Sequence, residues 1–317
     1  MKKNPILITI QEILIILFSI TSVMNISIQT AHSFPIYAQQ GYENPREATG
    51  RIVCANCHLA QKIVSIEVPK SILPNSVFEA KISIPYETNS KQILGNGAEG
   101  NLNTGAVLIL PEGFRLAPKS LLNREMKDKT KNFYAQPYST SKENILVIGP
   151  VASKNNQEII FPILSPDPQK DKNVFFLKYP IYVGGNRGRG QIYPTGEKSN
   201  NNIITSSVSG TIKNIEEKDS GGFSINIQKN NGEIMNEDIP KGLKVIVSEG
   251  NTISINQNLT NDPNVGGFGQ NETEIVLQSP TRIKSMIIFF ISVTITQIFF
   301  VLKKKQWEKV QAADMNF

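Results

Sequence analysis

The residues between 63 and 276 form many short runs rich in β-branched and aromatic side chains, separated by Gly, Pro and Asn. Alternation with a period of two places every second side chain on one face of a strand, and little helical periodicity is present. The clearest runs are residues 77–84, 106–110, 144–148 and 174–179. This pattern predicts an all-β fold in which two sheets bury their apolar faces as a sandwich.

Residues 207–260 contain shorter runs than the rest of this region. The runs alternate around strings that are typical of hairpin turns, at 219–222, 230–232 and 249–251. We therefore expect a small β domain that is inserted before the chain returns to the larger one.

A helix between the chain ends is expected at one place only. Asn44 can cap a helix, Pro45 suits its first turn, and Glu47 supplies an acidic residue there. The pattern predicts a short helix that begins close to residue 45.

The first 33 residues have the three parts of a secretory leader. Lys2 and Lys3 come first, an uncharged apolar run occupies residues 13–23, and a small-residue site follows at 31–33. We expect cleavage after residue 33, so that Phe34 becomes the mature N-terminus. The leader also predicts export of the region that follows it.

A second apolar segment lies near the C-terminus. Residues 285–302 carry no charge, and a helix of this length nearly spans the hydrocarbon core of a bilayer. The lysines at 303–305 predict that the tail stays on the side of synthesis, with the β region across the membrane. A buried core helix is the alternative, but Gln297 and scattered Ser and Thr do not form a polar face.

The chain has a net charge of +6, most of which lies near its ends. Residues 1–33 contribute +1 and residues 281–317 contribute +4, so residues 34–280 carry only +1. A protein that binds nucleic acid needs a basic face that displaces many counterions. The nearly neutral main body therefore argues against a nucleic-acid partner.

The string CANCH contains both cysteines of the chain, Cys54 and Cys57, followed by His58. At this spacing two thiols can form thioether bonds to one haem while the histidine binds its iron. A zinc half-site would need further Cys or His ligands, and a redox dithiol would need a surrounding βαβ pattern, neither of which this sequence has. We expect one covalently attached haem c, with no cysteine left for a structural disulfide.

A six-coordinate haem iron needs a second axial ligand besides His58. His32 is the only other histidine, and it lies in the leader. The remaining candidates are the thioethers of Met126 and Met235 and the α-amino group of Phe34, which leader cleavage creates. The chemistry of the residues leaves these three open.

Two glycine-rich strings do not indicate a further site. Residues 95–100 match the pattern G-x-G-x-x-G, but a strand-like run follows where a dinucleotide site needs a helix, so we expect a surface loop. The arginines of residues 184–190 are more typical of solvated turns than of an anion site.

Several longer strings resemble the cytochrome f family, the membrane-bound c-type cytochromes of the photosynthetic cytochrome bf complex. The resemblance covers almost the whole mature chain, and its most specific parts are residues 34–50, 54–58, 105–114, 184–194, 264–270 and 303–317. It implies an elongated two-domain β architecture with a single C-terminal transmembrane helix. The implied parts are a leader (1–33), a large lumenal haem domain (34–201), a small inserted β domain (202–263), a return segment of the large domain (264–281), the transmembrane helix (283–302) and a tail (303–317).

The resemblance also implies the role of individual residues. The α-amine of Phe34 would bind the iron opposite His58, which makes leader cleavage a step of cofactor assembly. The residues that would pack against the haem are Pro35, Tyr37 and Pro194. Those that would hold a buried chain of waters are Gln92, Asn186 and Gln191, with Asn201 and Asn264 as less secure matches.

As a function, the resemblance implies electron transfer without chemical change of a substrate, so we do not expect an enzyme. The electron would come from the Rieske iron-sulphur protein and leave to plastocyanin or a soluble c-type cytochrome. The other implied partners are cytochrome b, subunit IV and membrane lipid. The implied location is the thylakoid membrane, with the haem domain in the lumen and the tail in the stroma of a plastid or the cytoplasm of a cyanobacterium.

Three other kinds of protein share some of these sequence features. Another membrane-anchored periplasmic c-type cytochrome would have a histidine–methionine ligand pair. A haem peroxidase or oxygen sensor would have an open sixth position. A haem-free exported adhesin would use Cys54 and Cys57 as a small disulfide loop.

The sequence departs from the family pattern at two places. The family usually begins with tyrosine, and Phe34 keeps the amine and the ring. Plants and green algae carry a lysine patch that attracts acidic plastocyanin. Lys91 and Lys218 remain here, but Ala98, Glu99 and Ser220 stand where lysines are usual. We therefore expect weaker electrostatic steering of the carrier.

Overall fold

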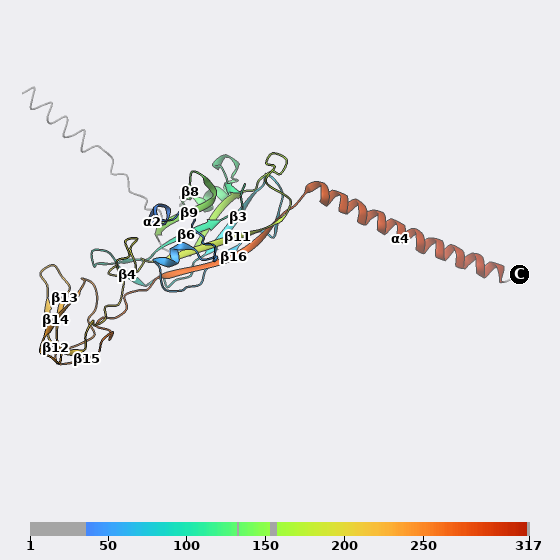
Figure 1. Ribbon diagram of the computed structural model, residues 1–317. Coiled ribbons are helices and arrows are strands. Elements are labelled where there is room, and N and C mark those ends of the chain that lie inside the picture. The colour runs from blue at the N-terminus through green and yellow to red at the C-terminus, as the bar shows by residue number, and fades with distance from the viewer. Residues whose placement is uncertain (1–35, 132, 153–156, 316–317) are drawn as a thin grey trace, which may run out of the picture. The chain divides into compact units, whose positions relative to one another are not determined.

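The computed structural model of the chain describes residues 36–131, 133–152 and 157–315 (Figure 1). The predicted leader, its cleavage site, Phe34 and Pro35 lie outside these residues. Strands make up most of the regular structure between residues 63 and 277, and a single long helix follows them. The all-β prediction with one C-terminal helix is confirmed.

Two sheets enclose the main hydrophobic core. One has the strand order β2-β16-β11-β6-β9-β8 and the other the order β1-β3-β10-β7. Their strands are β1 (Ser65–Glu67), β2 (Ser71–Ile72), β3 (Val77–Ser83), β6 (Asn103–Ile109), β7 (Arg115–Leu116), β8 (Gln136–Ser139), β9 (Lys142–Ala152), β10 (Glu158–Leu164), β11 (Lys178–Arg187) and β16 (Gly267–Leu277). All but one of the pairings are antiparallel, and β2 joins β16 in parallel.

The core follows from the alternation in the sequence. On β3, Phe78, Ala80 and Ile82 are buried, and the residues between them are only partly covered. Phe161 of β10 lies opposite Ala80 and is fully buried, and Leu108 of β6 brings the other sheet into the same cluster. The period of two therefore places the apolar residues of both sheets in one shared core.

Strand β11 lies between β16 and β6 and positions a polar side chain within the sandwich. Asn186 is opposite Phe268 on β16 and Gly105 on β6. A Cβ atom at residue 105 would lie 2.6 Å from the Asn186 amide oxygen, so only glycine leaves room for this amide. The absence of a side chain at Gly105 thus leaves space for the Asn186 amide next to β6.

A separate four-stranded sheet has its own small core. Its strand order is β14-β13-β12-β15, from β12 (Gly210–Glu217), β13 (Phe223–Gln228), β14 (Ile234–Ile239) and β15 (Thr252–Ile253). Ile212, Ile225 and Ile227 are the centre of its core. The predicted turns at 219–222 and 230–232 join consecutive strands of this sheet, and their glycines have positive φ. These two hairpin predictions are therefore confirmed. The hairpin predicted at 249–251 is wrong, because this turn leads into β15, which pairs with β12 and not with the preceding strand β14.

The string at 95–100 joins the two-stranded sheet of β4 (Lys91–Ile93) and β5 (Glu99–Asn101). Leu94 N–H donates to the carbonyl of Ala98, and Gly97 has a φ of 80°, as in a tight turn. No helix opens here, so the prediction of a loop is confirmed.

The helix predicted close to residue 45 is wrong. Arg46 instead forms an antiparallel bridge with Ile52, and the Pro45 carbonyl accepts from Val53 N–H at 2.9 Å. The backbone of this segment pairs across a turn, which leaves no i→i−4 bonds for a helix. Short helices flank it, namely α2 (Ile36–Gly41) and the 3₁₀ helix η1 (Val53–Asn56).

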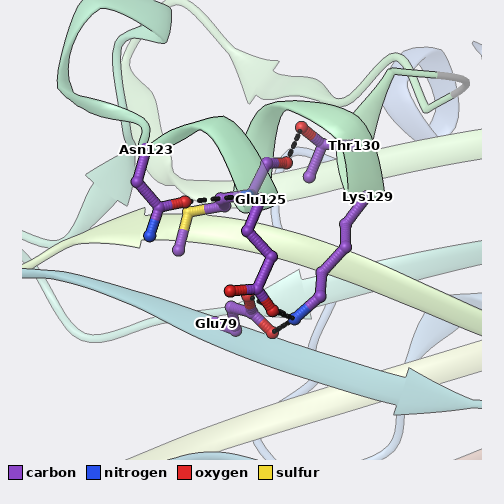
Figure 2. Close-up of polar contacts among 6 residues, drawn as sticks. Glu79, Asn123, Glu125, Lys129 and Thr130 are labelled. Carbon is purple, nitrogen blue, oxygen red and sulfur yellow. Dashed lines mark hydrogen bonds and ion pairs between the residues drawn. The ribbon is translucent and has the colours of Figure 1, made fainter.

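An unpredicted helix, α3 (Arg124–Thr130), follows the 3₁₀ helix η2 (Lys119–Leu121). The Asn123 side chain accepts from Met126 N–H at 2.7 Å and so caps α3. Lys129 reaches Glu125 at 2.8 Å and Glu79 of β3 at 3.0 Å, which Figure 2 shows as a link between helix and sheet. These surface ion pairs and the cap stabilise a helix of only 7 residues.

The run at 174–179 is a strand only from Lys178 onward, so the prediction is wrong for residues 174–177. Val174 is buried, but the three residues after it are exposed. The hydrogen bonds of this segment are local, because Val174 N–H donates to Asp171 O and Leu177 N–H donates to Phe175 O.

The long C-terminal helix is α4 (Pro280–Asp314), drawn in red in Figure 1. Ser279 caps it by accepting from Arg282 N–H at 3.3 Å, and Pro280 occupies the first turn. It is long and apolar enough to cross a membrane, and none of its residues is buried against the rest of the described chain. The transmembrane segment lies within α4, which continues beyond the three lysines at 303–305.

Candidate haem site

The string CANCH folds into a compact turn. Cys54 lies in η1, and its carbonyl accepts from the N–H groups of Cys57, at 3.2 Å, and His58, at 3.0 Å. Both cysteines are free thiols and half-buried. Ile52 and Val53 are buried just before them and anchor the turn to the protein. The turn therefore presents two thiols and an imidazole from one short segment.

Burial sets the protonation of all three side chains. It raises the pKa of the Cys54 thiol to about 12, raises that of Cys57, and lowers the pKa of His58 to about 4. The thiols are therefore protonated at neutral pH, and the imidazole is uncharged. An uncharged imidazole has the free lone pair that a metal ligand requires.

His58 has one paired and one unpaired ring nitrogen. The Asn186 amide Nδ2 lies 3.2 Å from His58 Nε2, and Nδ1 is buried without a hydrogen-bond partner among the described residues. A metal-bound imidazole uses one nitrogen for the ion and the other for a hydrogen bond. Because an amide Nδ2 can only donate, Nε2 is the acceptor and carries the lone pair of the uncharged imidazole, while Nδ1 carries its proton. The two thiols and this one lone pair fit a covalent haem, and an iron bound at Nε2 would take the place of the Asn186 contact.

The segment around His58 is held by the loop that follows β11. Gln191 N–H donates to the Cys57 carbonyl at 2.7 Å, and its side-chain oxygen accepts from Leu59 N–H at 3.0 Å. A Cβ atom at residue 190 would lie 3.2 Å from the Cys57 carbonyl oxygen. Gly190 and Gln191 therefore fix the backbone on both sides of His58.

Other predicted polar residues are buried with unpaired atoms. Gln92 donates to Asn101 O at 2.8 Å, and Asn201 donates to Arg189 O at 2.9 Å. The side-chain oxygens of Gln92 and Asn201 have no partner in the described part of the chain. Asn201 Nδ2 also lies 3.5 Å from Asn264 Oδ1. Buried polar atoms of this kind are the usual partners of internal water.

The residues predicted to pack on the haem are only partly described. Tyr37, on α2, is 61 % exposed, and Pro194 is also exposed. Phe34 and Pro35 lie outside the described residues. The predicted α-amine ligand is therefore not described.

Sequence reasoning missed Tyr138, which anchors α2 near the haem turn. Its hydroxyl lies 2.5 Å from Ala38 O and 2.6 Å from Tyr42 O, and its carbonyl accepts from the Gln39 side chain at 2.8 Å. Tyr138 is buried in the cluster against which Cys54 packs. Burial raises its pKa to about 12, so the hydroxyl stays protonated and able to donate. About a hundred residues separate the partners, and no local pattern reveals such a contact.

The two candidate methionine ligands lie in other parts of the fold. Met126 is buried with Ala117, Leu122 and Leu164. Met235 is on β14, opposite Ile227 in the small sheet. Neither belongs to the cluster that contains Cys54.

Lys91 and Lys218, which remain of the predicted lysine patch, have polar partners. Lys91 Nζ contacts the side-chain oxygen of Asn101. Lys218 Nζ forms an ion pair with Asp238 at 2.5 Å. The positive charge of Lys218 is thus partly compensated at the surface.

Comparisons with known proteins test the family resemblance. Residues 34–188 match the family model described as apocytochrome F, N-terminal, and residues 200–317 match apocytochrome F, C-terminal. The chain belongs to the cytochrome f family. A cytochrome f from Gracilaria tenuistipitata var. liui is 67% identical over 304 residues, which is 96% of this chain and 98% of the relative. The cytochrome f of Porphyra purpurea is 62% identical over the full length of both chains.

Membership of the cytochrome f family supplies the general function. The chain is a c-type haem protein and an electron-transfer subunit of the cytochrome bf complex. Its transmembrane helix is α4.

Proposed function

We propose that this chain takes single electrons from the Rieske iron-sulphur protein and passes them to plastocyanin or a soluble c-type cytochrome. The observation that carries the proposal is the juxtaposition, in one turn of a cytochrome f chain, of two free thiols with the half-buried, uncharged imidazole of His58. Cys54 and Cys57 would hold one haem c through thioether bonds, and His58 would be an axial ligand. When bound, the haem supplies reversible one-electron chemistry at its iron.

The α-amine of Phe34 is the proposed second axial ligand. It is supported by the positions of its competitors, because Met126 packs in a cluster that does not contain Cys54 and Met235 lies on β14 of the small sheet. It is also supported by Tyr138, which fastens Ala38, four residues after Phe34, beside the cluster of Cys54. The rival function, a periplasmic cytochrome with a histidine–methionine pair, would require one of these methionines to move.

The buried amides near His58 are proposed to keep the site rigid and to hold ordered water. Asn186 would lie beside the imidazole, and Gln191 would fix the backbone that carries it. Gln92 and Asn201 offer the unpaired oxygens that a chain of waters needs. Asn264 Oδ1, which accepts from Gly266 N–H at 3.0 Å, lies beside Asn201 and would be a further partner of these waters. Tyr37, Pro35 and Pro194 would cover the haem surface and exclude bulk water.

The proposed arrangement in the cell follows the proposed domain boundaries. Residues 34–201 and 264–281 would form the large lumenal domain, and residues 202–263 the small one, which the separate core around Ile225 supports. The thylakoid membrane would hold residues 283–302, and the tail 303–317 would lie in the stroma or the cytoplasm. Cytochrome b, subunit IV, the Rieske protein and membrane lipid are the proposed neighbours.

The test of the function is stopped-flow oxidation of the reduced, membrane-bound protein by oxidised plastocyanin. We expect rapid oxidation whose rate depends only weakly on salt, because Ala98, Glu99 and Ser220 stand where lysines are usual and Lys218 is paired with Asp238. Asp238→Asn frees the charge of Lys218 and is expected to raise the rate at low salt by about two- to fivefold.

Glu112→Gln is the matched control, since Glu112 is an exposed acid in the turn between β6 and β7, whereas Asp238 is on β14. It is expected to leave the rate unchanged. A steep salt dependence of the original protein would contradict the weak steering, and the absence of any oxidation by an electron carrier would contradict the function itself.

A further inference from the structure

Three consecutive large apolar side chains are exposed in the loop before β11. Phe175 is 59%, Phe176 38% and Leu177 53% exposed, and Leu73, just after β2, is 46% exposed. These four residues are called the apolar patch below. Single exposed apolar residues are normal, but a run of this size usually marks a surface that contacts another apolar phase.

The exposure of the loop is built into the fold. The Tyr179 hydroxyl accepts from Phe175 N–H at 2.9 Å and donates to the Phe175 carbonyl at 2.8 Å. The Tyr179 ring packs edge-on against Phe114, and Val174 is buried in the main core. The loop is therefore fastened at both ends while the residues between them point away from the core.

The apolar patch is adjacent to the residues that lead into the membrane. Leu277 N–H donates to Leu177 O at 3.0 Å, and Gln278 N–H donates to Ile72 O at 2.8 Å. Both parts of the patch thus flank the end of β16 at Leu277, and α4 begins three residues later, at Pro280. The chain from residue 277 to the uncharged run at 285 can extend at most about 18 Å.

A connection of this length keeps the apolar patch close enough to contact the bilayer surface. The polar layer on each side of a bilayer is roughly 5–8 Å thick, and apolar side chains sink into its boundary with the acyl chains. Lys172 lies in the same loop, and Arg282 and Lys284 lie in the first turns of α4. Long basic side chains in such positions can reach lipid phosphates while their stems cover apolar surface.

We infer that the apolar patch inserts into the lipid interface on the side of the membrane that carries the β domains. The occupant is lipid because covalent continuity with α4 keeps the patch close to the bilayer. The loop thus provides a second point of attachment besides the helix and restricts how the large domain tilts on its anchor.

The test uses tryptophan fluorescence of the full-length holoprotein in vesicles of phosphatidylcholine and phosphatidylglycerol. Trp307 is the only tryptophan of the chain, so Trp307→Phe provides a dark background for Phe176→Trp. The control is Ile234→Trp in the same background, because Ile234 is 61% exposed on β14 of the small sheet. Emission is compared in vesicles with and without bromine at shallow positions of the acyl chains.

For Phe176→Trp we expect blue-shifted emission that brominated lipid quenches and aqueous iodide does not. For Ile234→Trp we expect emission without a blue shift, which aqueous iodide quenches and brominated lipid does not. Quenching of Phe176→Trp by iodide alone would overturn the inference, and protection from both quenchers would overturn it in favour of a protein contact such as a second copy. If Phe176→Trp does not fold by circular dichroism, Leu177→Trp, at the same patch, gives the same readout.

Discussion

Replacing both Cys54 and Cys57 with serine will abolish covalently bound haem. The thioether bonds need the two sulfur atoms, and no other cysteine is present in the chain to replace them. Either single replacement is expected to leave haem attached through one remaining bond. The hydroxyl of serine preserves the size of the side chain, so the turn around the Cys54 carbonyl should persist.

The measurement is haem staining after electrophoresis under denaturing conditions, which removes haem that is bound only through iron. Ala55→Ser is the matched control. Ala55 lies between the two cysteines, and its replacement introduces the same hydroxyl without removing a thiol. It should retain full staining. Staining of the double variant at the level of this control would contradict the assignment of the cysteines.

Phe161→Ala will cause a large loss of stability, about 3–5 kcal/mol in the free energy of unfolding. Phe161 has no exposed surface, lies opposite Ala80 in the register of β10 and β3, and belongs to the core shared by both sheets. Its truncation removes apolar contacts and leaves a cavity that neighbouring strands cannot fill without losing their register.

Chemical denaturation of the full chain in detergent, followed by far-ultraviolet circular dichroism, measures the effect. Phe175→Ala is the matched control, because it removes the same ring from a site that is 59% exposed. In detergent it should change the free energy of unfolding by less than about 0.5 kcal/mol. Equal losses for both variants would contradict the placement of Phe161 in the core.

The alternation of apolar residues predicted much of the sandwich but could not locate every element. It identified β3, in which burial alternates with a period of two. It also identified β6 and β9 as runs of β-branched and apolar residues, although residues 104–108 and 145–148 are buried on both faces of these strands. It misread residues 174–177, since an aromatic run looks the same in a strand and in an exposed loop. It also misread residues 44–48, where long-range pairing overrides a local helix signal.

The candidate haem site also contains residues that the sequence could predict and residues that it could not. Cys54, Cys57 and His58 are close in sequence, so their shared role was readable from spacing alone. Tyr138 lies about a hundred residues from the groups it bonds, and its role depends on the pairing of β8 with β9. The roles of such residues become visible only when the sheet has brought them together.

His58 and the α-amine of Phe34 are the two proposed axial ligands of the haem iron. Near-infrared magnetic circular dichroism of the oxidised, leader-processed protein tests this pair, because the position of the charge-transfer band reports the two ligands. We predict a histidine–amine band. A histidine–methionine band would contradict it and would move the second ligand to Met126 or Met235.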